Sequence, residues 1–173
     1  MSSTPALLRR IQADWQRVRP GLNARPMLTY LLITRLQAAL ARQVERTHRD
    51  SGLNAATWDL LITLRRSAPE AGLTPAELAG LTALTGASIT NRIGNLRGRG
   101  LAERVINEQD RRSAFVRLTP RGLNLADHLL PTHLNNETEL FAVLDEQDRA
   151  DLERIAFKLL AKLEEQEEVG EVL

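Results

Sequence analysis

The 173-residue chain contains no cysteine, and this absence excludes disulfide bonds, thiolate metal sites and cysteine-based redox sensing. It also lacks any run of about 18 apolar residues, so we expect no membrane-spanning helix. The first residues reach Arg9 and Arg10 without the apolar stretch and cleavage site of a secretory signal. Together these absences predict a soluble, cytoplasmic protein.

The net charge is only +1, which by itself says nothing about nucleic acid. The charges are nevertheless unevenly distributed along the chain. Residues 85–121 contain eight arginines and three acids, whereas residues 145–173 contain ten acids and four bases. A basic middle and an acidic tail predict that the middle binds phosphate groups, which would repel the tail. The alternative interpretation is that both stretches are ordinary solvated faces.

The spacing of apolar residues predicts five helices outside the central region, over 4–19, 27–49, 55–66, 120–144 and 145–168. The first helix carries Trp15 on its apolar face and is too short to be stable alone. The second is apolar over much of its girth, which indicates burial on more than one side. We therefore expect residues 4–50 and 120–168 to form the helices of a homodimer, within one domain spanning 1–173.

The central region begins with a strong signal for the start of a helix, Thr74-Pro75-Ala76-Glu77. The threonine hydroxyl can cap the helix N-terminus, proline fits the first helical position and Glu77 completes a capping box. A turn and a second helix over 85–99 follow, with Thr85 as the expected cap. Two short strands are then predicted over 101–106 and 113–118. This order predicts a mainly α fold with a small β wing, in which residues 54–118 form a winged helix-turn-helix flanked by dimerisation helices and an extra N-terminal helix.

On a helical wheel, the helix over 85–99 places Ile89, Ile93 and Leu96 on one stripe. Small polar residues lie opposite, as a helix in the major groove of duplex DNA requires, since asparagine pairs with adenine and hydroxyls meet bases or phosphates. Arginines at the tip of the ribbon are suited to a minor groove. For the ribbon alone, an ordinary surface hairpin is the alternative. The expected DNA-binding residues are Thr85, Ser88, Thr90, Asn91, Asn95, Arg111 and Arg112.

Several motifs resemble the MarR family of dimeric winged-helix regulators, namely the stretch 99–101, the wing motif 110–112 and Leu118-Thr119-Pro120. Ala13-Asp14-Trp15, the segment 51–61 and Asn91-Arg92-Ile93 are similar to its urate-responsive (HucR-like) branch. The resemblance implies a repressor that urate or a related purine releases from a palindromic operator. It also implies an effector site formed by three side chains: Trp15, Asp59 and Arg92. Where that branch can carry a histidine in the dimer seam, this chain has Gln37.

The wheel is compatible with that site, because Arg92 lies beside the apolar stripe and not on the DNA side. An Asp59–Arg92 pair is then feasible, and a planar anion would stack on Trp15 and accept hydrogen bonds from Arg92. The alternatives are that Trp15 is a core or seam residue, that Asp59 is a solvated acid and that Arg92 contacts phosphate.

Other functions remain open at this point. The regulator could answer a phenolic or other aromatic carboxylate, or have no effector and simply coat DNA. An enzyme using Asp59 as a base is disfavoured, since the sequence shows no nucleophile–base pair, phosphate loop or metal cluster. His48, His128 and His133 lack metal-ligand spacing, so neither a metal nor another cofactor is expected.

Overall fold

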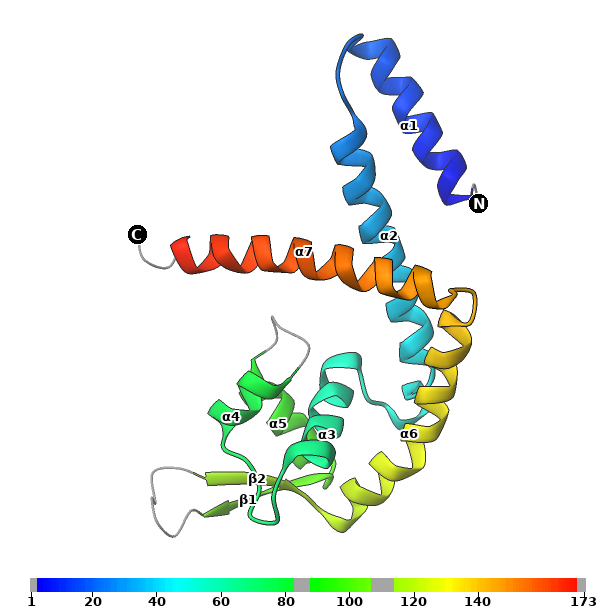
Figure 1. The fold of residues 1–173 in the computed structure, drawn as a ribbon. Coiled ribbons are helices and arrows are strands. Elements are labelled where there is room, and N and C mark those ends of the chain that lie inside the picture. The colour runs from blue at the N-terminus through cyan, green and yellow to red at the C-terminus, as the bar shows by residue number, and fades with distance from the viewer. Residues whose placement is uncertain (1–2, 83–87, 107–113, 171–173) are drawn as a thin grey trace. The chain divides into compact units, whose positions relative to one another are not determined.

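The structure is a computed structural model that describes residues 3–82, 88–106 and 114–170 (Figure 1). Within these ranges the chain is mostly helical with one two-stranded antiparallel sheet, which confirms the predicted fold class. No helix in these ranges is long and apolar enough to cross a membrane. The elements in chain order are α1 (Thr4–Val18), α2 (Arg25–Arg46), η1 (Arg49–Ser51), α3 (Ala55–Ser67), α4 (Pro75–Leu81), α5 (Ile89–Gly98), β1 (Ala102–Ile106), β2 (Ala114–Leu118), α6 (Pro120–Phe141) and α7 (Glu146–Gly170).

The chain divides into two compact units, Met1–His133 and Leu134–Leu173. The core of the first unit lies where α3 packs against α4, α5 and β2. Its fully buried side chains are mostly leucines, which fill the space between these elements at the close packing of a protein interior. They include Leu60, Leu61, Leu64, Leu78, Leu96 and Val116.

Local sequence signals set where the helices of this core begin. The Asn54 side chain accepts a hydrogen bond from the Thr57 amide at 2.9 Å and so caps α3. Thr74 and Glu77 form the predicted capping box at the start of α4. Both caps satisfy amide groups that the first helical turn leaves without partners.

The predicted N-cap of the next helix was wrong by three residues, because Ser88 and not Thr85 is the N-cap residue of α5, which begins at Ile89. Serine is a preferred residue type at this position, and Gly86 would weaken a helix that began at Thr85. Thr85 itself lies outside the described residues.

The wing strands pair as predicted, with Ala102 opposite Leu118 and Ile106 opposite Ala114. Leu73, ahead of α4, also forms a β-bridge to Val116. Gly122, in the first turn of α6, lies against the carbonyl oxygen of Leu101, where a Cβ atom would not fit. Helix α6 therefore starts directly against the turn that ends α5.

Large apolar side chains remain at the surface of several helices. Tyr30 of α2 is 69% exposed and Phe157 of α7 is 67% exposed. Further exposed apolar residues on these two helices are Leu32, Ile33, Leu36, Leu152, Ile155, Leu159, Leu160 and Leu163. The dimerisation role of residues 4–50 and 120–168, and the organisation of 1–173 as one domain, stay predictions.

Candidate DNA interface and effector site

Helix α5 presents an apolar face to the core and a polar face to solvent. Ile93 and Leu96 are buried, and Ile89 packs against the same core, as the helical wheel predicts. The exposed side chains of this helix and its N-cap include the predicted polar set Ser88, Thr90, Asn91 and Asn95. The structure therefore places these four residues together on a surface that a DNA groove can reach.

Asn91 and Asn95 differ in how far their amides are already engaged. The Oδ1 atom of Asn95 accepts a hydrogen bond from Arg99 Nε at 2.9 Å. A bidentate pair with adenine uses the oxygen and the nitrogen of the amide, so Asn95 would have to share its oxygen or release Arg99. Of the two asparagines, Asn91 is thus the better placed to read a base.

Only part of the wing can be compared with the prediction, because Arg111 and Arg112 lie outside the described residues. Within β1 the Arg104 side chain is exposed. At the other end of the ribbon, Arg117 Nε donates to Glu103 Oε1 at 2.8 Å across the strand pair. This contact joins β1 to β2 beside the first strand pairs of the wing.

Arg92 points into the protein and not toward the DNA-facing side. Its side chain is 4% exposed, and its Nη1 atom lies 3.4 Å from Oδ2 of Asp59 on α3, whose side chain is 14% exposed. The inward position of Arg92 that the wheel predicts is confirmed, and the Asp59–Arg92 contact that the sequence made feasible is present; their role in binding an effector stays a prediction. Because α3 packs against α5, this pair ties the candidate DNA-reading helix to the element behind it.

Trp15, the third predicted effector residue, lies on another pair of helices. It is half-buried on α1, which packs against α2, and Arg35 Nε of α2 donates to Thr4 Oγ1 at 3.0 Å. Asp59, by contrast, lies on α3, which packs mainly against α5, α4, β2 and α2. The structure thus brings two of the three predicted effector residues into contact and places the indole on a separate helix pair.

A cluster of rings that the sequence did not predict lies at the junction of η1, α3 and α6. His48 is 1% exposed, its Nδ1 atom is 2.9 Å from the Leu53 carbonyl oxygen, and its ring stacks on Trp58 at 5.5 Å. Trp58 also contacts His133, with ring centroids 4.9 Å apart. No sequence signal links residues so far apart in the chain. Among the described residues, no group of His, Asp and Glu side chains is arranged to hold a metal ion.

Comparisons with known proteins agree with this geometry. The model of the MarR family matches residues 51–113. The chain is 27% identical over 142 residues to the HTH-type transcriptional regulator PecS of Dickeya dadantii, covering 82% of this chain and 86% of that protein. It is 30% identical over 147 residues to the transcriptional repressor MprA of Escherichia coli, covering 83% of each.

A solved structure also matches the fold. Bordetella bronchiseptica BpsR is 25% identical, with a TM-score of 0.64, and the match covers 74% of this chain and 89% of that chain. BpsR is described as a protein whose DNA binding is regulated by 6-hydroxynicotinic acid. Both curated relatives are named as regulators of transcription.

Proposed function

The chain belongs to the MarR family of transcriptional regulators, and from this premise we propose that it is a homodimeric repressor released from its operator by a flat aromatic anion, with urate or a related purine as the first candidate. One observation carries the proposal. The candidate DNA-reading helix α5 holds a buried arginine, Arg92, paired at 3.4 Å with Asp59 of the helix behind it.

The two faces of α5 support the DNA-binding part of the proposal. Its outward face offers hydroxyls and amides, the groups that read base edges in a major groove, and it carries the exposed Asn91. Its inward face is anchored by Ile93 and Leu96. A helix held this firmly on one side presents its other side at a fixed angle to the duplex.

The exposed apolar faces of α2 and α7 support a homodimer. Large apolar side chains gathered on an exposed helix face are unusual on a monomer in water and mark interaction surfaces. A two-fold dimer presents two copies of α5, which in this class of motif read half-sites about 34 Å apart. A pseudo-palindromic operator of double-stranded DNA then follows from the symmetry of the protein.

Release by an anion follows from the Asp59–Arg92 pair. A planar anion that reached Arg92 would accept hydrogen bonds from its guanidinium and compete with the Asp59 carboxylate. Losing one partner of a buried ion pair costs about 3–5 kcal/mol, whereas useful allosteric coupling needs only about 1–3 kcal/mol. We propose that the displaced pair shifts α5, so that the two reading helices of the dimer lose their spacing.

Trp15 supplies the stacking surface in this proposal, because an indole face binds flat heteroaromatic rings. Its place on α1 requires the anion to bridge from the α1–α2 pair to the α3–α5 pair, either within a subunit or across the dimer. A regulator of this kind that answers an aromatic carboxylate is the second candidate, favoured by the action of 6-hydroxynicotinic acid on the related BpsR.

The test measures fluorescence anisotropy of the wild-type dimer on labelled duplex taken from upstream of its own gene. Urate, 6-hydroxynicotinate and salicylate are titrated in separately at constant salt, since DNA affinity depends steeply on salt. We expect urate to lower DNA affinity most, and Trp15→Ala to abolish that response while leaving DNA binding intact. Arg10→Gln, also on α1, is the matched control and keeps the response.

Three results decide between the candidates. A stronger effect of 6-hydroxynicotinate or salicylate, still dependent on Trp15, replaces urate by an aromatic carboxylate. Specific DNA binding that none of the three anions changes would falsify the effector proposal and leave the repressor. Binding that does not distinguish this duplex from a shuffled sequence would remove the repressor as well.

A further inference from the structure

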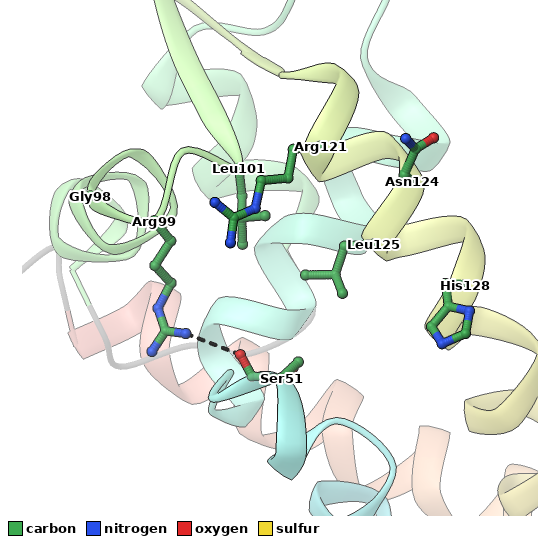
Figure 2. A pocket seen from close by; sticks show the side chains of 8 residues that line it. All are labelled: Ser51, Gly98, Arg99, Leu101, Arg121, Asn124, Leu125 and His128. Atoms are coloured by element: carbon green, nitrogen blue, oxygen red, sulfur yellow. Dashed lines mark hydrogen bonds between the residues drawn. The ribbon is translucent and has the colours of Figure 1, made fainter.

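An arginine at the end of α5 joins that helix to η1. Arg99, the C-cap residue of α5, donates from Nε to Oδ1 of Asn95 at 2.9 Å and from Nη1 to the carbonyl oxygen of Ser51 at 3.1 Å. Figure 2 shows the Arg99 side chain extending from the end of α5 toward Ser51, the last residue of η1. One guanidinium therefore contacts both the exposed face of the candidate DNA-reading helix and a separate short helix.

Backbone geometry holds this bridge at both of its ends. The Arg99 amide donates to the Asn95 carbonyl oxygen at 3.2 Å, so the last turn of α5 fixes the two residues at helical positions i and i+4. Gly52 follows η1 with a φ of 70°, and a Cβ atom on it would lie only 2.8 Å from Nη1 of Arg99. The glycine thus leaves the space that the guanidinium occupies.

The chemistry of arginine determines which way the Asn95 amide turns. A guanidinium carries hydrogen-bond donors and no acceptor, so its partner on Asn95 has to be the amide oxygen. Turning the amide over would set its NH₂ group against Nε of Arg99, donor against donor, and the hydrogen bond would be lost. Arg99 therefore holds Oδ1 of Asn95 on its own side and directs the Nδ2 group away from itself.

The surface around Asn95 leaves room for a DNA duplex. Asn95 lies on the exposed face of α5 with Ser88 and Asn91, which precede it by seven and four positions. A Cβ atom added to Gly94 or Gly98 would meet no atom of the described residues within 4 Å. Because neither glycine carries a side chain, base edges can approach the helix backbone beside Asn95.

An amide that offers its N–H donors suits some base edges better than others. In the major groove guanine presents two neighbouring acceptors, O6 and N7, whereas adenine presents a donor at N6 beside its N7 acceptor. A bidentate contact with adenine needs both the oxygen and the nitrogen of an amide, but N–H donors alone can bind guanine. In the orientation that Arg99 holds, Asn95 is therefore suited to guanine, and Asn91 is the candidate for adenine.

We propose that Arg99 is a positioning residue for sequence recognition, which fixes the Asn95 amide so that Asn95 selects guanine over adenine at one base pair of each half-site. The inference rests on the DNA binding proposed above. Arg99 acts through Asn95 in this scheme, because its removal frees the amide to turn over and pair with adenine.

The test measures the affinity of the full-length protein for a panel of duplexes, by fluorescence anisotropy at constant salt. The parent duplex comes from upstream of its own gene, and each base pair of one half-site is replaced in turn by the other three. Asn95→Ala identifies the base pair that Asn95 reads, because discrimination is lost there. At this pair we expect the wild type to favour guanine, and Arg99→Met to lower the ratio of guanine to adenine affinity at least about fivefold.

Arg97→Met is the matched control, because Arg97 is an exposed arginine of the same helix. Loss of its charge should weaken binding to every duplex by a similar factor and leave the guanine-to-adenine ratio unchanged. In the Asn95→Ala background, Arg99→Met should not change the ratio further. A loss of stability in Arg99→Met would lower both affinities together, so the ratio reports the orientation of the amide and not the integrity of the fold.

The outcomes separate this inference from the proposed repressor. An unchanged ratio in Arg99→Met, with specific binding intact, would overturn the inference and leave the repressor. A wild type that favours adenine at this pair, an equal shift of the ratio in Arg97→Met, or an Asn95→Ala variant that loses discrimination at no base pair would do the same. Wild-type binding that does not distinguish the parent duplex from a shuffled sequence would overturn both.

Discussion

Two arginine–aspartate pairs connect α3 to its neighbours. Their contact distances alone would give the wrong order for how strongly each pair stabilises the protein. Arg65 of α3 contacts Asp127 of α6 through two hydrogen bonds, at 2.7 and 3.3 Å. Asp59 of α3 contacts Arg92 of α5 at 3.4 Å. By geometry the α3–α6 pair is the better one.

Burial reverses that order. The Arg65 and Asp127 side chains are 44% and 53% exposed, whereas those of Arg92 and Asp59 are 4% and 14% exposed. In water, two charges 4 Å apart attract by about 1 kcal/mol, but by about 4 kcal/mol at an effective dielectric constant of 20. Loss of the Asp59–Arg92 contact should therefore lower the free energy of unfolding more than loss of the Arg65–Asp127 contact. The Asp59–Arg92 contact is also the one that holds the candidate DNA-reading helix α5.

The largest expected effect comes from removing the buried carboxylate. Asp59→Ala leaves the guanidinium of Arg92 without that partner in a site nearly closed to water, which costs about 3–5 kcal/mol of unfolding free energy. Urea denaturation of the full-length protein measures the loss. A cost below about 1 kcal/mol would contradict the comparison, because it would make the buried pair equivalent to an exposed one.

A double-mutant cycle separates this pair from its surroundings. Arg92→Met removes the charge and keeps much of the side-chain length, so Asp59→Ala combined with Arg92→Met should cost less than the sum of the two single changes. Strict additivity would mean that Asp59 and Arg92 stabilise the protein through other neighbours.

A smaller effect is expected when the charge of Asp59 is removed but an oxygen acceptor remains. Asp59→Asn keeps a carbonyl oxygen for Arg92 and loses the ionic part of the contact, so its cost should be about 1–3 kcal/mol and lower than that of Asp59→Ala. The same urea experiment compares the two variants. Equal costs would show that the charge of Asp59, and not the hydrogen bond that Asn can still accept, accounts for the stabilisation.

The sequence predicted the elements well where local chemistry determines them. The capping box of Thr74 and Glu77 and the alternating wing strands each depend on residues close together in the chain, and the structure confirms both. The start of α5 was mispredicted because Thr85 and Ser88 are both acceptable caps, and choosing between them depends on where α5 packs.

Contacts between distant residues were predicted only in part. The wheel indicated an inward Arg92, because periodicity fixes which face of a helix is buried. The pairing of its guanidinium with Asp59 needed the resemblance as well. Neither source pointed to the stack of His48 on Trp58, which depends on how η1 packs against α3, or to the contact of Trp58 with His133, which depends on how α6 packs.

Glu77 adds a third carboxylate to this comparison. Its side chain is exposed, yet it accepts a hydrogen bond from the backbone amide of Thr74. The Thr74 amide and hydroxyl donate to its carboxylate and lower the pKa of Glu77 below its ordinary value of 4.5. A lowered folded-state pKa gives stability that is present above the unfolded-state pKa and is lost as pH falls through the folded-state pKa.

We therefore expect Glu77→Ala to melt at a lower temperature than the wild type near neutral pH, and the gap to close as pH falls below about 4.5. Circular dichroism melts across this range measure it. Glu70→Ala, an exposed acid in the preceding loop, is the control for general effects of acid. A gap that is independent of pH would show that Glu77 acts through packing and not through its charge.

The smallest effect is expected from the exposed pair. Asp127→Ala removes both hydrogen bonds to Arg65, yet water replaces them on each side and dissolved ions screen the charges. Its urea midpoint should be indistinguishable from that of the wild type at physiological salt, with a small difference emerging only at low ionic strength. If Asp127→Ala instead destabilised the protein as much as Asp59→Ala, contact geometry would outweigh burial, and the buried Arg92 pair would lose its claim to be the stronger link between α3 and its neighbours.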